Sequence, residues 1–190
     1  MSSKLGVENI AHTNGTNAMT ISSGGVATFT NAPTGIIKSG TLINSTSGTS
    51  IDFTGIPSYV QNITVLLSGV STSGSSNLLL QLGDSGGIET SGYLGSIGNT
   101  GGSILVTSGV GITYSLNSSY VTHSQLSLWL VDASTNTWSI SSLGSGSVGG
   151  VVYFGTFSKS LSSTLDRVRV TATNGTDTFD AGKISMRYGG

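Results

Sequence analysis

The side chains that could carry out catalysis are few in this chain. It holds two histidines, eight carboxylates and no cysteine. Glu8 and His12 are four residues apart, a spacing that brings two metal ligands together on a helix, but no helical period surrounds them. His123 stands beside Ser124, yet neither lies in a nucleophile-elbow motif. We therefore expect a protein that is not an enzyme and that uses no cofactor.

Two further motifs contain carboxylates in turn-forming surroundings. Asp177 and Asp180, in NGTDTFDAG, could supply calcium ligands, although the full Asp-x-Asp-x-Asp-Gly series is absent. The alternative is that both carboxylates cap turns through hydrogen bonds to the backbone, and we assign no metal site. The sequence GDSGG at residues 83–87 is similar to the nucleophile loop of trypsin-like proteases. Without a matching histidine motif, it predicts a turn.

Aromatic side chains are the other candidates for a functional site. Tyrosine and tryptophan combine a large apolar surface with a polar group, so they suit stacking on sugar rings or contact with another protein. Trp129 lies opposite the leucines of its run, so it is either exposed for binding or buried in an interface or the core. The candidate residues for surface binding or an interface are Tyr93, Tyr114, Tyr120, Trp129 and Trp138.

The composition limits the kinds of partner. Charged residues make up 8% of the chain and the net charge is −1, whereas ordinary soluble domains are roughly one quarter charged. Binding to nucleic acid needs clustered Lys and Arg, so we exclude it. No run approaches the roughly 20 apolar residues of a membrane helix, so we expect no membrane insertion. So little charge limits the solubility of a lone monomer and favours a subunit of an assembly.

The elements that would position these side chains are predicted to be strands. Apolar and polar residues alternate in run after run, and no helical period is found. About ten short strands between Gly-rich turns predict an all-β fold, an antiparallel β-sandwich or jelly roll. The run Ile112–Leu116 is among the predicted strands. Because binding often uses loops on a rigid sheet, a receptor site is expected in the loops Ser71–Ser76, Gly98–Gly102 and Leu143–Gly150.

The alternation is clearest in residues 159–188. One run places Val168 on a buried face, and a second does the same with Ile184. The Asn-Gly pair at 174–175 between the two runs is a turn signal. The segment therefore predicts a closing hairpin, with its mixed charges on a solvated or intersubunit face.

The apolar residues also divide the chain into two parts. Residues 1–36 hold too little apolar material to fold alone. We expect this arm to be ordered by pairing with copies of itself or with a partner, the alternative being a flexible arm. Residues 37–190 hold the regular alternation and are predicted to form the β-sandwich.

Three stretches resemble, in order, parts of a domain of virion proteins of tailed bacteriophages. They span Ser50–Tyr188 and read SIDFTGIPSYVQNITVLLSGVSTSGSSNLLLQLGDSGGIETSGY, LSLWLVDASTNTW and SKSLSSTLDRVRVTATNGTDTFDAGKISMRY. The N-terminal KLGVENIAHTNGTNAMTISSGGVATF is similar to the leading segment of phage fibre proteins, in which short strands pair between chains.

The resemblance implies a homotrimeric structural protein on the surface of the phage particle, of the tail-fibre type. Its N-terminal arm would attach to other virion proteins of the tail or capsid, and its β-sandwich would face the host, where a cell-surface glycan is the expected contact. Two alternatives stay open: a capsid decoration or cement protein (head fibre) that braces the shell, and a carbohydrate-degrading spike. The second is disfavoured because no paired carboxylates lie on well-defined neighbouring strands.

Overall fold

The described part of the chain is built from strands and turns. The computed structural model describes residues 9–11, 17–21, 23–24, 27–29, 38–147 and 150–190, which contain sixteen strands and no helix. Every strand pair is antiparallel, and the strands form three sheets.

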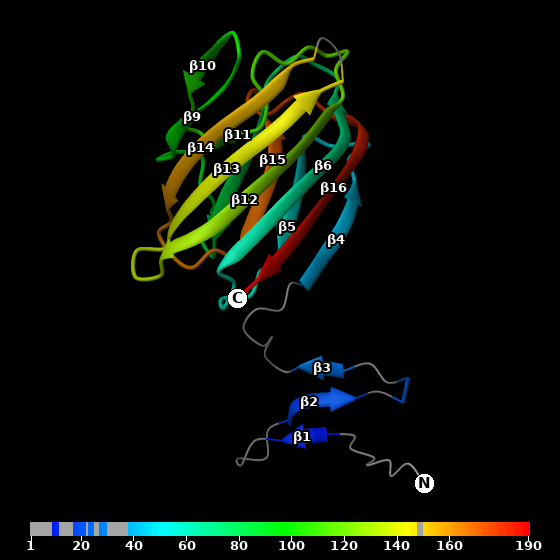
Figure 1. The fold of residues 1–190 in the computed structure, drawn as a ribbon, viewed down its shortest axis with the longest axis vertical. Helices are drawn as coiled ribbons and strands as arrows, with labels where there is room; N and C mark the ends of the chain where they lie inside the picture. The colour runs from blue at the N-terminus through cyan, green and yellow to red at the C-terminus, as the bar shows by residue number, and fades with distance from the viewer. Residues whose placement is uncertain (1–8, 12–16, 22, 25–26, 30–37, 148–149) are drawn as a thin grey trace.

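The largest sheet has eight strands in the order β10-β9-β14-β13-β12-β6-β16-β4 and faces the viewer in Figure 1. Its centre, β12, β13 and β14, is a meander whose neighbours in sequence pair directly. The strands span β4 Lys38–Asn44, β6 Asn62–Thr72, β9 Leu94–Asn99, β10 Gly102–Leu105, β12 Thr122–Asp132, β13 Thr137–Gly146, β14 Val152–Ser160 and β16 Phe179–Gly189.

A smaller sheet lies behind the first and completes a sandwich (Figure 1). Its order is β11-β7-β15-β5, and β8 pairs with β7 off this path. These strands span β5 Ser50–Thr54, β7 Leu78–Asp84, β8 Gly87–Ile88, β11 Val110–Gly111 and β15 Arg167–Ala172. The fold is therefore an all-β antiparallel sandwich, as the alternation predicts.

The three remaining strands belong to residues 1–36. They are β1 Asn9–Ala11, β2 Asn17–Ile21 and β3 Ala27–Phe29, and they pair in chain order to form a small antiparallel sheet. No described strand of this sheet pairs with a strand of the sandwich.

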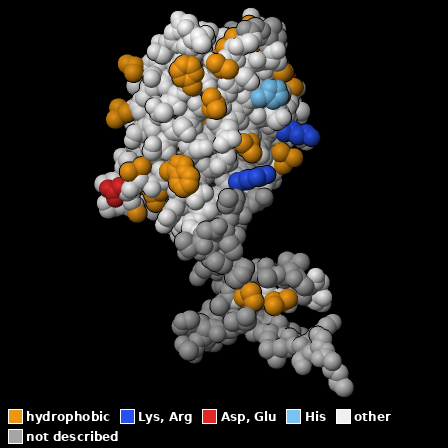
Figure 2. Space-filling model, viewed as in Figure 1, with side chains coloured by type: hydrophobic (Ala, Val, Ile, Leu, Met, Phe, Trp, Pro, Cys, Tyr) orange, Lys and Arg blue, Asp and Glu red, His pale blue; other side chains and the backbone are white. Residues whose placement is uncertain are grey.

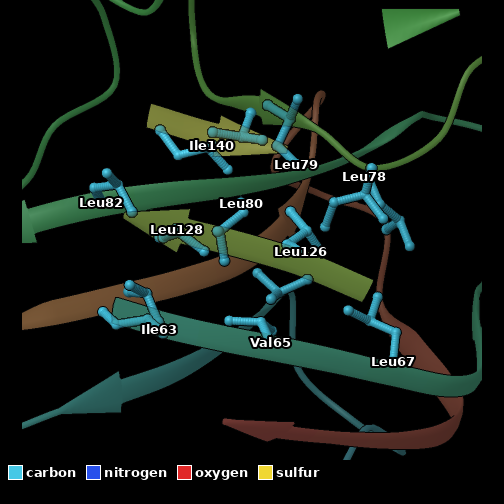
Figure 3. Packing of buried hydrophobic residues seen from close by; sticks show 14 of the residues in the cluster. Ile63, Val65, Leu67, Leu78, Leu79, Leu80, Leu82, Leu126, Leu128 and Ile140 are labelled. Carbon is cyan, nitrogen blue, oxygen red and sulfur yellow. The ribbon is translucent and has the colours of Figure 1, made fainter. Parts of the chain in front are cut away.

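The core is a double layer of aliphatic side chains between the larger and the smaller sheet of the sandwich. Alternate residues of β6 and β12 point inward and meet those of β7 (Figure 3). This is the packing expected when strands with one apolar face bury that face against another sheet. The labelled side chains are Ile63, Val65, Leu67, Leu78, Leu79, Leu80, Leu82, Leu126, Leu128 and Ile140.

β7 is buried along its whole length because its outer face is also covered. The segment 106–109 lies over that face, where the Gln81 side-chain amide donates a hydrogen bond to the carbonyl oxygen of Ser108 (2.9 Å). A strand buried on both faces explains why this run contains consecutive leucines.

β15 and β16 do not form the predicted closing hairpin. β15 lies between β5 and β7 in the smaller sheet, whereas β16 lies between β6 and β4 in the larger one. The predicted turn is present: Gly175 has a φ of 67°, and the Asn174 side chain accepts the backbone N–H of Thr176 (3.0 Å). The turn leads from one sheet to the other. The prediction of a hairpin is wrong because alternation identifies the buried face of a strand without identifying the sheet to which the strand belongs.

Other predicted boundaries are also wrong. β6 continues to Thr72, β9 to Asn99 and β13 to Gly146, so part of each of the three predicted loops lies in a strand. Residues 112–116 were predicted as a strand, yet they run irregularly after β11 while Ile112 and Leu116 are buried. Apolar residues that fill the end of a sandwich do not need a strand partner, and a pattern of burial alone does not show the difference.

Candidate functional site

The candidate catalytic and metal-binding residues do not converge. Glu8 and His12 lie outside the described residues. His123 is exposed at the start of β12, and its Nδ1 accepts a hydrogen bond from the backbone N–H of Gly69 (3.2 Å). In the described ranges, no group of three or more His, Cys, Asp or Glu side chains is arranged to hold a metal ion.

Asp177 and Asp180 form hydrogen bonds to residues at the end of β6 and in the segment that follows it. Asp177 accepts hydrogen bonds from the side-chain amide of Asn174 (2.6 Å) and the backbone N–H of Ser76 (3.1 Å), which lower the pKa of its carboxyl. Asp180 accepts a hydrogen bond from the hydroxyl of Ser71. The local Asx turn is made by Asn174, not by either aspartate. Asp177 does accept a backbone N–H, but from the segment after β6, whereas the Asp180 contact is to a side-chain hydroxyl.

The GDSGG motif forms a turn, as predicted. It connects β7 to β8, and the backbone N–H of Gly86 donates to the Asp84 carboxylate (2.8 Å). The second Asp84 oxygen accepts a hydrogen bond from the Ser162 hydroxyl (2.6 Å). These contacts lower the pKa of Asp84, with the Ser162 bond making the larger contribution. Ser162 thereby fixes the turn to the segment after β14.

Beside this turn lies a buried ion pair between Lys159 and Glu89. Lys159 is 5% exposed, and its ammonium lies 5.3 Å from the centre of the Tyr93 ring. The Tyr93 hydroxyl accepts the backbone N–H of Leu82 (2.7 Å) and donates to the carbonyl of Glu89 (3.0 Å). Burial raises the pKa of Tyr93 well above its ordinary value. The cluster holds the 89–93 segment against the sandwich.

We expect this ion pair to make stability depend on pH. Burial raises the pKa of Glu89, but hydrogen bonds from Lys159 and the backbone N–H of Ser162 lower it more, so its net pKa is below the ordinary value. A lowered pKa contributes stability at neutral pH that is lost as the pH falls below about 4.3 and through the folded-state value.

Glu89→Gln should therefore reduce the free energy of unfolding at neutral pH by about 1–2 kcal/mol, because the amide keeps hydrogen bonds but leaves a buried ammonium without its counter-charge. Urea unfolding at neutral and acidic pH measures this effect. The difference between wild type and variant should shrink in acid, and a constant difference would contradict the assignment.

The structure divides the aromatic candidates. Tyr93 and Trp138 are buried, so surface binding is wrong for these two. Tyr114 and Tyr120 are half-buried and pack against the core. Trp129 is 60% exposed on the outer face of β12, which excludes the core position and leaves two alternatives, a binding surface and an interface between subunits. Of the five residues, Trp129 is the one that a partner can reach over most of its ring.

Trp129 belongs to a broad surface that we call the uncharged face, the outer face of β6, β12, β13, β14, β9 and β10. The described side chains of these strands include only two charges: Lys159, which points inward, and Asp132, at the end of β12. Figure 2 shows hydrophobic side chains spread over this otherwise mostly neutral surface. Its large apolar residues, each more than one-third exposed, are Leu94, Leu105, Trp129, Leu143, Val152 and Phe154. Val131, 66% exposed, lies at the bulge near the end of β12.

Strand pairing arranges the uncharged face in rows. In one row, the paired residues of five neighbouring strands all carry hydroxyl side chains. Because neighbouring strands are about 4.8 Å apart, this row extends over roughly 19 Å. An adjacent row pairs Phe154 with Leu143 across β14 and β13. On the far side of the hydroxyl row, Trp129 pairs with Ser139 and Asn62. The hydroxyl row consists of Ser96, Thr156, Ser141, Ser127 and Thr64.

A hollow of about 340 Å³ lies on this face beside Phe154. Apart from Phe154, its lining residues are all small, so small side chains create the depression. They are Ser96, Gly98, Ser103, Ser142, Gly155 and Thr156. The uncharged face thus offers flat aromatic and aliphatic surface together with neutral hydroxyl groups. This chemistry suits a neutral polar partner with apolar faces and does not suit a strongly charged one.

The outer face of the smaller sheet is different. Arg169 donates two hydrogen bonds to Asp52 (2.7 and 2.9 Å), and Arg167 donates two to Asp166 (2.6 and 3.0 Å). The Arg167 hydrogen bonds lower the pKa of Asp166. Two arginines of the C-terminal run are therefore paired with carboxylates at the surface, one within the run and one on β5.

Sequence reasoning missed the aliphatic and phenylalanine members of the uncharged face. Their odd or even position along each strand was a usable signal, because alternate residues face opposite sides of the sheet. Trp138 and Ile140 point inward, which places Leu143 on the outer face, and Tyr153 does the same for Phe154. Residues of the wrong parity in an otherwise alternating strand are thus candidates for contact with a partner.

Comparison with known proteins adds no relative: no family model, curated protein or solved structure matches this chain. Among the described residues, no helix has the length and hydropathy needed to cross a bilayer.

Proposed function

We propose that this chain is a non-enzymatic structural protein of a phage virion surface, of the tail-fibre type, that contacts the host through its uncharged face. The observation that carries the proposal is the exposure of Trp129 and Phe154 on the uncharged face, which presents hydroxyl groups and only Asp132, at the end of β12, as an outward charge. The exposed Lys183 and Arg187 of the same sheet lie on β16, beside this face. The resemblance of residues 50–188 to phage virion proteins supports the same class.

A neutral cell-surface glycan is the host ligand that fits this face. Sugar rings have apolar faces that stack on aromatic rings and hydroxyl groups that exchange hydrogen bonds with serine and threonine. Trp129 supplies the first kind of contact, and the row from Ser96 to Thr64 supplies the second. Adjacent hydroxyls about 4.8 Å apart provide repeated contacts for a polymer that crosses the strands.

We expect Trp129→Ala to weaken adsorption of the purified protein to host cells by at least about tenfold, because a tryptophan at the centre of an interface commonly contributes about 2 kcal/mol. The free energy of unfolding should change by less than about 0.5 kcal/mol, since the ring is largely exposed. Thr90→Ala, an exposed change beside Arg167 and Arg169 on the other sheet, is the control and should bind like wild type.

Location in the particle tests the proposal directly. Labelled antibodies against the chain should mark the tail of the intact virion. A label on the head would contradict the tail-fibre role and favour a capsid decoration protein. Unchanged adsorption of particles that lack the protein, together with a glycan array without hits, would remove host contact.

A further inference from the structure

The larger sheet of the sandwich has an open edge at each side. β10 ends the sheet at one side and β4 ends it at the other (Figure 1). Among the described strands, neither pairs with a second neighbour. An edge strand presents a row of backbone N–H and C=O groups that can accept a strand from another chain.

β10 lacks the features by which proteins usually protect an edge. It contains neither a charged residue nor proline, and all four of its residues are exposed. Ile104 pairs with Ile97, a core residue, so it faces the inner side of the sheet; yet it is 40% exposed. Leu105 faces the outer side and is 83% exposed. The strand therefore leaves its backbone edge and both apolar faces uncovered within the described part of one copy.

The opposite side of the same sheet has a complementary shape. A groove of about 330 Å³ opens between β4 and β5, where the two sheets separate. Phe53, Ile56 and Met186 contribute apolar atoms to its lining, and Thr41, Asp52 and Thr54 contribute polar ones. On the outer side of β4, Leu42 is 58% exposed. An uncovered strand with an inward isoleucine thus lies at one side, and a groove beside an edge strand lies at the other.

We propose that β10 of one copy of this chain pairs with the free edge of β4 in a second copy. Because the strands would join one continuous sheet, side chains keep their faces: Leu105 lies beside Leu42 on the outer side, and Ile104 enters the groove on the inner side. Each contact covers apolar surface that one copy leaves exposed.

This contact is preferred over symmetric pairing of two β10 strands, which would leave the groove and Leu42 uncovered. It is heterologous, so successive copies form a closed ring if the rotation closes and an open chain if it does not. The interface concerns how copies join, and it does not depend on what the uncharged face binds.

Two leucine substitutions in neighbouring strands test the interface. Leu105→Lys places a charge on the proposed contact, whereas Leu94→Lys places the same charge on β9, beyond the end of β10, at a position that is 72% exposed. Light scattering at micromolar concentration should give wild type and Leu94→Lys the same mass, a multiple of 19.2 kDa, and Leu105→Lys a smaller mass. A monomeric wild type, or equal masses for the two variants, would overturn the proposal. Circular dichroism checks that each variant is folded.

Cross-linking tests the identity of the paired edges, because the chain has no cysteine of its own. Under oxidation, Leu42→Cys/Leu105→Cys should form covalent multimers. A mixture of the two single variants should stop at a covalent dimer, and each single variant alone should stay uncrosslinked. Covalent dimers from Leu105→Cys alone would show symmetric β10 pairing and sink the proposal, as would a double variant that does not cross-link.

Discussion

Leu128→Ala should lower the free energy of unfolding by about 3–4 kcal/mol, one of the two largest effects expected in this protein. Leu128 is fully buried at the middle of β12 and points toward the layer formed by β7 (Figure 3). Truncation removes the transfer free energy of its methyl groups and leaves a cavity that a packed double layer closes only in part.

The matched control is Leu143→Ala, the same chemical change on the neighbouring strand β13. Leu143 is exposed on the outer face, so its truncation should change the free energy of unfolding by less than about 0.5 kcal/mol. Urea unfolding of both variants measures the difference. Similar losses for the two leucines would mean that the uncharged face is buried in the folded protein as it exists in solution.

Gly182→Ala should cost about 2–5 kcal/mol, for a reason that lies in the backbone. Gly182 has a φ of 97° and sits where the pairing of β16 with β6 shifts register. A Cβ atom there would lie 2.5 Å from the carbonyl oxygen of Gly69 and 2.6 Å from the Cα of Val70. The variant therefore combines an unfavourable φ with a clash against atoms that move only if β6 moves.

Gly55→Ala separates these two causes. Gly55 has a φ of 73°, but a Cβ atom there would have no neighbour within 4 Å. It should lose only the conformational term, about 1 kcal/mol. Thermal unfolding compares the two variants, and equal shifts in Tm would show that the close approach of Gly182 to β6 is unimportant.

Much of the fold could be predicted because burial repeats with the period of the strand. Leu126 and Leu128 share a parity in the sequence and share the core in the structure. The same holds for Val168 and Val170. The alternation of side chains between the two faces of a strand depends only on neighbouring residues, so it can be predicted without knowledge of the rest of the chain.

The candidate site was less accessible to sequence reasoning. Tyr93 and Trp129 are both aromatic residues next to apolar runs, yet one is buried and the other is exposed. Tyr93 is covered because Lys159 and Glu89, which are far apart in sequence, meet beside it. A contact of that kind has no signature in the local pattern of either segment.

The sequence by itself determined that this protein is an all-β sandwich, which side chains of each strand face the core, and that the chain carries very little charge. Only the tertiary structure decided which strands are partners and which strands are left at the edges. β15 and β16 follow one another in the chain but pair in different sheets, while β10 and β4 come to lie at opposite sides of one sheet. The physical reason is that strand faces are set by a local period, whereas strand neighbours are set by contacts between residues distant in sequence.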